Sequence, residues 1–212
     1  MAQPATATLG TRTTLLEAAR QVLHDRGYAA LSTREVAAAA GVPLSQIHYH
    51  FGSKQGLVLA LFEYLNEQLF ERQKALFDDP SLSFADQWER ACAYLDEDLA
   101  SGYVRIMHEL AAAGWADPEV GAVVRESLLG WARLVTELAR RFEERIGGFG
   151  PLSAEDVGAL ISNAFIGAES LVLTGIEEGG IPTRAALRRA GALIRALEKA
   201  KEDSDASQAP AK

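Results

Sequence analysis

The chain has 212 residues and 48% of them are apolar, so it can bury a substantial core in one large domain or two small ones. Its single cysteine excludes an intramolecular disulfide. The N-terminal residues lack the apolar stretch of a signal peptide, and no uninterrupted apolar run reaches the roughly 18 residues of a membrane span. We therefore expect a cytoplasmic protein with no membrane partner.

The charge is unevenly distributed along the chain. The net charge of -8 argues at first against a partner made of nucleic acid. Residues 1–54, however, carry five Lys or Arg against three Asp or Glu, so the acidic excess lies in the remainder. A mildly basic N-terminal segment on an acidic body is typical of two domains that have different partners.

Apolar residues recur at helical spacing along almost the whole chain and strand-like alternation is nearly absent, which predicts an all-α fold. The first helix is expected at about residues 11–26 and ends at Gly27. A second helix of about eight residues follows the capping pattern formed by Ser32 and Glu35, and it stops at Gly41. The apolar pattern therefore begins with two short helical segments separated by tight turns.

A third short helix through His50 precedes a long helix at about residues 55–77. Five further helices are expected, at about residues 84–99, 103–113, 118–146, 153–174 and 184–201. The first ten residues, 1–10, and the tail, 202–212, show no apolar pattern and are expected to be disordered.

Two short helices joined by a tight glycine turn are typical of a helix-turn-helix, whose second helix enters the DNA major groove. The stretch "LLEAARQVLHDRGYAALSTREVAAAAGVPLSQIHYHFGSKQGLVLALFEYL" resembles the N-terminal domain of the TetR family of bacterial transcriptional regulators. The resemblance covers about residues 15–61 and includes "GY", "AGV" and "YHFGSK" in order. It implies a three-helix DNA-binding domain at 11–54 and a larger helical ligand-binding and dimerisation domain at 55–201.

The candidate DNA contacts are the side chains that the helix-turn-helix does not need for its own packing. They are Thr33, Arg34, Leu44, Ser45, Gln46, His48, Tyr49, His50 and Lys54. Gln46 is the best candidate for direct readout, because its amide can pair bidentately with an adenine edge, and Leu44 can contact a thymine methyl group. In some members of the family, an arginine at the position of Arg34 reaches a guanine. The resemblance also implies that Thr33, Lys54 and the "HYH" stretch contact phosphates and sugars.

The two histidines raise the alternative of a metal site. His48 and His50 lie two residues apart on a helix, which sets them roughly 200° apart around its axis, so they cannot share one metal ion. Two surface histidines of a generic helical hairpin remain a further alternative. No metal or other cofactor is expected, and the absence of HExxH, GxSxG, GxGxxG and P-loop motifs argues against an enzyme.

The last two predicted helices are candidates for dimerisation, because a lone helix-turn-helix makes too few contacts and a dimer can read a palindrome. The candidate dimer residues are Leu160, Ala164, Phe165, Ala168, Leu171, Leu187 and Ile194. In the family, these two helices form a four-helix bundle with their partner copies. The alternative is that this apolar surface belongs to the core of one chain.

Large side chains in the middle helices are candidates for a small-molecule pocket, where the resemblance places one. The candidates are Tyr94, Tyr103, Met107, His108 and Trp131, and Trp88 and Trp115 share their character. Each of them could instead be a core residue. Cys92 is expected to be a small buried hydrophobic side chain.

The resemblance therefore implies a homodimeric DNA-binding regulator, expected to be a repressor that a small apolar or amphipathic effector releases from a palindromic operator. Its expected partners are double-stranded operator DNA, the effector and a second copy of the chain. The alternative is a helical adaptor that acts through protein contacts.

Overall fold

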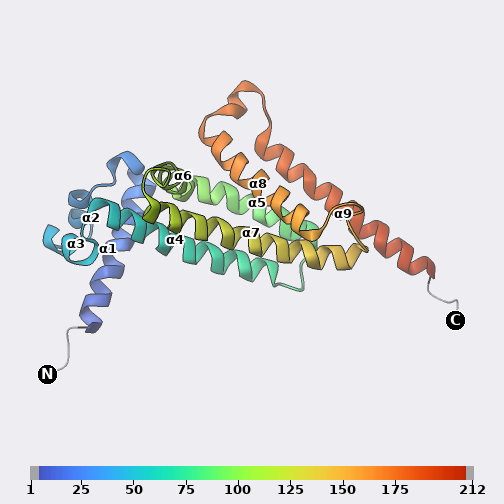
Figure 1. Cartoon of the computed structure of the whole chain (residues 1–212), viewed down its shortest axis with the longest axis horizontal. Helices are drawn as coiled ribbons and strands as arrows, with labels where there is room; N and C mark the ends of the chain where they lie inside the picture. Colours follow the sequence, from blue (N-terminus) through green and yellow to red (C-terminus); the bar gives the residue numbers. More distant parts are fainter. Residues whose placement is uncertain (1–4, 209–212) are drawn as a thin grey trace. The chain divides into compact units, whose positions relative to one another are not determined.

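The computed structural model describes residues 5–208, which form α-helices, two single-turn 3₁₀ helices and no β-strand (Figure 1). The predicted all-α class is thereby confirmed. In chain order the elements are α1 (Ala5–Arg26), η1 (Tyr28–Ala30), α2 (Thr33–Ala39), α3 (Leu44–Phe51), α4 (Lys54–Phe77), α5 (Phe84–Ser101), α6 (Tyr103–Ala113), α7 (Pro118–Ile146), α8 (Ala154–Leu173), η2 (Ile176–Gly179) and α9 (Thr183–Gln208).

The chain folds into two compact units. The first contains the described residues up to Leu69 together with Asp98–Arg125, and the second contains Phe70–Glu97 together with the described residues from Glu126 onward. Because the divisions fall inside α4, α5 and α7, each of these helices runs from one unit into the other. The units thus follow packing, whereas the expected domains 11–54 and 55–201 follow function and stay a prediction.

The helix-turn-helix is held together by a small apolar core within the first unit. Leu15 and Leu23 of α1, Val36 of α2 and Ile47 of α3 are almost completely buried. Each such side chain contributes roughly 1.5–3 kcal/mol when it leaves water. This shared core fixes α3 relative to α1 and α2, and leaves the opposite side of α3 exposed.

The turns of this motif follow the local sequence closely. The Ser32 Oγ accepts a hydrogen bond from the Glu35 N–H at 3.2 Å and caps α2 as predicted. The second half of the expected capping box is not formed, because the Glu35 carboxylate pairs with Arg26 instead. At the other end, the N–H groups of Gly41 and Val42 donate to carbonyls of the last turn of α2, at 3.1 Å each, with Gly41 at φ 66°. This is a Schellman ending, which favours glycine because it needs a positive φ.

Of the two ends expected to be disordered, residues 5–10 lie in α1 and residues 202–208 lie in α9. Ion pairs extend α9 where the apolar pattern ends: Lys201 pairs with Asp205 at 2.9 Å and Arg145 of α7 pairs with Glu202 at 2.9 Å. Residues 1–4 and 209–212 lie outside the described residues.

Helix α8 leaves much of its apolar surface uncovered in the single chain. By length and composition alone it is the one helix among the described residues that could cross a membrane, yet only 22% of its most apolar stretch is buried. A search for an uninterrupted apolar run misses this helix, because Ser162, Asn163 and Glu169 interrupt it. An exposed apolar surface on a helix is typical of an interaction site.

Candidate DNA-binding and effector sites

All nine candidate DNA contacts lie on α2, on α3 or at the first residue of α4, within the first unit. Arg34, Ser45, His48 and Lys54 are exposed, and Tyr49 is the most exposed large side chain of α3, at 73%. The others, Thr33, Leu44, Gln46 and His50, are half-buried. Helix α3 therefore presents polar and aromatic side chains on the side opposite to Ile47.

The two histidines of α3 have different surroundings. The His48 ring is exposed and its Nδ1 lies 3.2 Å from the Gly52 carbonyl oxygen at the end of the helix. The His50 ring packs edge-on against Tyr49, with 4.9 Å between centroids, and its Nε2 is buried with no hydrogen-bond partner. His48 is thus the more accessible of the two. The described part of the chain contains no cluster of three His, Cys, Asp or Glu side chains able to hold a metal ion.

Two basic side chains flank α3. Lys54 is the first residue of α4, and its Nζ lies 5.7 Å from the centroid of the Tyr28 ring. At the same helix start, the Ser53 Oγ accepts the Gly56 N–H at 3.0 Å. The Arg12 guanidinium of α1 lies 5.6 Å from the ring centroid of Phe51 of α3. Our sequence reasoning missed Arg12, because only the tertiary packing of α1 against α3 brings it there.

An open groove of about 550 Å³ also lies in the first unit. Its polar side chains include Tyr28, Lys54 and Glu109, and burial together with the Glu109 charge raises the pKa of Tyr28. The Gln55 Nε2 donates to the Asp117 Oδ2 at 2.8 Å, which lowers the pKa of Asp117. Asp117 Oδ1 also accepts the Glu119 N–H at 3.0 Å, so this carboxylate caps α7.

The second unit contains a cavity of about 50 Å³ lined by apolar side chains from α4, α5, α7, α8, α9 and the α7–α8 loop. Half of the lining is aromatic: Phe77, Phe84, Trp88, Trp131, Phe142, Phe149 and Phe165. No described residue that lines it carries a charge. Apolar walls of this kind are typical of small-molecule sites, although such sites usually enclose about 300–1,000 Å³.

The structure does not bring the five candidate ligand residues together. Only Trp131 lines the cavity. Tyr94 is buried in the same unit, where the Arg72 and Arg90 guanidinium groups lie 4.0 and 4.6 Å from its ring centroid. The candidates lie apart because the chain passes from one unit to the other within α5, so that the residues of α6 belong to the core of the first unit.

The other three candidates lie in the core of the first unit. The Tyr103 hydroxyl donates to the Asn66 Oδ1 at 2.8 Å, and its ring stacks on Phe62. Met107 is buried, and His108 is half-buried with a pKa lowered by desolvation. These three side chains thus pack within the first unit, away from the cavity of the second. Cys92 is buried as expected, and burial raises the pKa of its thiol to about 11.

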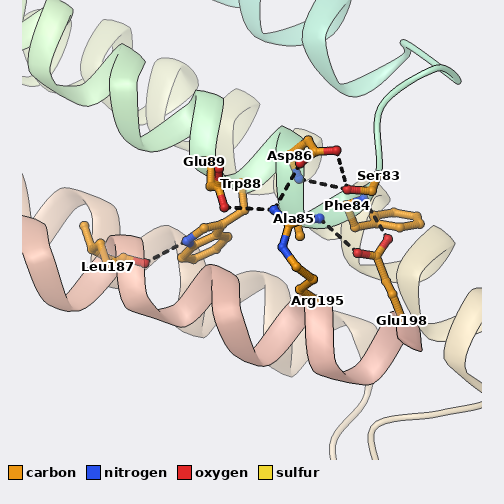
Figure 2. Close-up of polar contacts among 9 residues, drawn as sticks. All are labelled: Ser83, Phe84, Ala85, Asp86, Trp88, Glu89, Leu187, Arg195 and Glu198. Atoms are coloured by element: carbon orange, nitrogen blue, oxygen red, sulfur yellow. Dashed lines mark hydrogen bonds and ion pairs between the residues drawn. The ribbon is translucent and has the colours of Figure 1, made fainter. Parts of the chain in front are cut away.

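Trp88 joins the cavity to α9 (Figure 2). Its indole N–H donates to the Leu187 carbonyl at 2.7 Å, and its ring lies so close to Gly191 that a Cβ there would come within 3.0 Å of it. The same ring meets Phe165 of α8 edge-on, with 5.4 Å between centroids. A glycine at residue 191 is thus what lets the ring lie on α9.

Charged side chains of α9 form hydrogen bonds and ion pairs with the start of α5 (Figure 2). The Glu198 carboxylate accepts the N–H groups of Phe84 and Ala85, at 2.9 and 3.3 Å, and thereby caps α5 from another helix. The Arg195 guanidinium donates to Asp86 at 3.0 Å and to Glu89 at 2.9 Å. These bonds and Trp88 fix which side of α9 faces inward.

Two of the seven candidate dimer residues are buried inside the chain. Phe165 and Ala168 are 5% and 3% exposed, and Phe165 packs between Trp88 and Trp131. Gly158 of the same helix packs closely on Thr136 of α7. This side of α8 thus packs inside the single chain.

The remaining dimer candidates are at least partly uncovered. Leu160 is 60% exposed, Leu171 is 41% exposed and Ala164 is exposed, whereas Leu187 and Ile194 are half-buried. Sequence reasoning passed over Leu193, which is 69% exposed and is the more accessible neighbour of Ile194; Leu197, on the same side of α9, is 46% exposed. We define the outer face of α8 and α9 as Leu160, Ala164, Leu171, Leu193 and Leu197.

The helix-turn-helix segment matches a known family. Residues 15–61 match the family model described as "Bacterial regulatory proteins, tetR family". Beyond this segment, the structure of a TetR-family transcriptional regulator from Pectobacterium atrosepticum resembles 92% of this chain and 94% of its own, with 25% identity and a TM-score of 0.63. The DNA-binding segment is thus that of the TetR family. The chain is a DNA-binding transcriptional regulator of this kind and not an enzyme.

Two curated relatives carry names of the same kind. The HTH-type transcriptional regulator UidR of Escherichia coli strain K12 is 25% identical over 169 residues, which are 79% of this chain and 82% of UidR. The HTH-type transcriptional regulator CymR of Pseudomonas putida is 36% identical over 110 residues, which are 49% of this chain and 51% of CymR. The similarity to TetR-family regulators thus extends from the DNA-binding segment to the fold.

Proposed function

We propose that this TetR-family regulator is a cytoplasmic homodimeric repressor, which a small apolar or amphipathic effector releases from a palindromic operator. The observation that carries the proposal is the exposed side of α3, where Ser45, Gln46, His48 and Tyr49 stand on a well-packed helix-turn-helix. In such a motif these side chains face base edges in the major groove. Lys54 and Arg12 add positive charge that suits the flanking phosphates.

The outer face of α8 and α9 supports a homodimer. Its leucines are 41–69% exposed in a single chain, so each would gain about half of the roughly 1.5–3 kcal/mol that full burial of an exposed leucine gives. Two copies related by a two-fold axis would cover these faces with each other. A symmetric dimer also presents two α3 helices to a palindrome, which a single chain cannot do.

The cavity of the second unit supports effector binding. Phe77, the last residue of α4, lines the cavity, and α4 continues without a break to Lys54 at the DNA-binding end. An effector that shifts Phe77 would act on this helix, and two recognition helices must stay about 34–36 Å apart to enter successive major grooves. By linkage, operator DNA must weaken effector binding by the same factor by which the effector weakens DNA binding.

The test is to select bound sequences from a random DNA pool with the purified protein and to weigh the complex. We expect one palindrome bound by an even number of chains. If a folded, dimeric protein enriched no sequence, the repressor function would be refuted, and a role through protein contacts would take its place. The effector is then identified as the compound that releases the protein from this palindrome.

A further inference from the structure

The cavity of the second unit is too small, as it stands, for the effector that we propose for it. It encloses about 50 Å³. An apolar protein cavity that binds benzene has about 150 Å³, so the site lacks room for even one aromatic ring by about 100 Å³. A ligand can enter only if a lining side chain leaves.

Most of the lining side chains cannot leave easily. Trp88 is held by the Leu187 carbonyl, and Phe165 packs between Trp88 and Trp131. These residues lie in the middle of helices, so their withdrawal would disturb several contacts at once. The lining thus has a rigid part that belongs to the helices.

Phe149 is different, because among the described lining residues it alone lies outside a helix. It is half-buried and its ring centroid is 6.0 Å from that of Phe142. Its neighbours Gly148 and Gly150 have φ values of 122° and 67°, and a Cβ at either one would meet nothing within 4 Å. Phe149 forms an isolated antiparallel bridge with Leu152, in which the Leu152 N–H lies 3.5 Å from the Phe149 carbonyl oxygen, a long distance for a hydrogen bond. Segments with few contacts of this kind open most easily.

We propose that Phe149 is a plug, and that the effector is an uncharged compound with one aromatic ring that takes the place of the Phe149 ring. This inference rests on the proposed role of the cavity as the effector site. Withdrawal of one ring-sized side chain supplies about the missing volume. The vacated place faces Phe142 and other aromatic side chains, which favour offset or edge-to-face contact with a ring.

The chemistry of the wall excludes a charged effector. No described lining residue carries a charge, and the indole N–H of Trp88 is already bonded to Leu187. A carboxylate or an ammonium group would lose its hydration there and find no partner in return. An uncharged ring loses little hydration and gains the dispersion contacts that the plug makes in the closed state.

The experiment follows tryptophan emission in the absence of DNA. A Trp115→Phe background removes the tryptophan that is 90% exposed and leaves Trp88 and Trp131, which both line the cavity. We expect toluene to change the emission in a saturable manner, whereas benzoate and benzylammonium have no effect at a concentration about tenfold higher. Phe149→Ala should bind toluene about fivefold more tightly or better, because the plug no longer competes with the ligand.

Leu152→Ala is the matched control, because Leu152 lies in the same loop, is 42% exposed and does not line the cavity. It should bind toluene as the Trp115→Phe background does. Ala139→Val adds bulk to the wall and should weaken binding. If Phe149→Ala fails to fold by circular dichroism, Phe149→Leu takes its place, and it too should bind more tightly.

Equal binding of benzoate or benzylammonium would overturn the inference, and so would an affinity for toluene that does not rise in the folded Phe149 variant. The two proposals fail separately. A protein that binds its palindrome but not toluene would refute the plug and leave the repressor intact. A protein that binds toluene as predicted but no operator would refute the repressor and leave the plug intact.

Discussion

At the scale of single residues, α3 separates side chains that hold the motif from side chains that face outward. Ile47 is fully buried, whereas Tyr49, two residues later, is 73% exposed. Gln46 is half-buried next to Ile47, so the packing of α3 fixes its backbone. A polar side chain held on a rigid helix is suited to reading one base pair.

We predict that Gln46→Ala costs about 1–3 kcal/mol on the cognate palindrome and little on random DNA, because a bidentate amide contact is specific for one base. Fluorescence anisotropy with both DNAs measures this difference. Equal losses on the two DNAs would show that Gln46 contacts the backbone only.

Lys54→Ala is the matched comparison. Its ammonium is exposed beside the Tyr28 ring and suits a phosphate, so its loss should weaken both DNAs alike and reduce the salt slope by about one. A loss confined to the cognate palindrome would instead assign Lys54 to base readout.

At the scale of elements, the turn between α2 and α3 sets the direction in which α3 leaves. Gly41 has a φ of 66°, and the Schellman bonds at 3.1 Å depend on that conformation. An L-residue with a Cβ adopts it only at a cost of roughly 1–2 kcal/mol. The geometry of the recognition helix thus depends on one glycine.

We predict that Gly41→Ala lowers the free energy of unfolding by about 1 kcal/mol or more. Gly10→Ala is the control, since Gly10 lies inside α1 without a positive φ, and alanine there should stabilise by up to about 1 kcal/mol. Urea unfolding of the two variants measures both effects. Equal stabilities for both variants would contradict the role that we give to the turn.

At the scale of the whole molecule, the single chain leaves apolar side chains of α8 and α9 uncovered. Its outer face on α8 and α9 is apolar and exposed, while the acidic excess lies outside residues 1–54. Burial of the outer face in a dimer leaves the acidic surface to water and the mildly basic segments to DNA. Dimerisation and operator binding are therefore expected to fail together.

We predict that Leu193→Glu yields a folded monomer that has lost its affinity for the palindrome, because a carboxylate buried without a partner destabilises the interface. Analytical ultracentrifugation and anisotropy measure the two properties. Leu152→Glu, also on an exposed leucine of the second unit but outside α8 and α9, should leave the dimer intact. A Leu193→Glu variant that stays dimeric would exclude this face.

Local patterns were enough for the elements and for the family. The helices predicted at 103–113 and 118–146 have the bounds seen in the structure, and Ser153 caps α8 with a complete capping box as its spacing with Asp156 indicates. The segment 15–61 identified the DNA-binding motif. Helical periodicity, caps and glycine turns involve residues close in sequence, so the sequence alone determines them.

Only the tertiary structure decided which apolar side of a helix faces inward. Phe165 was expected at a dimer surface and lies between Trp88 and Trp131, whereas Leu193 was passed over and is exposed. Tyr103 and Trp131 were expected in one pocket and belong to different units. Burial of an apolar helix is favourable against any apolar neighbour, because the hydrophobic effect has no direction. The periodicity of a helix therefore predicts that one side is buried. The neighbour against which that side packs is decided by residues distant in sequence.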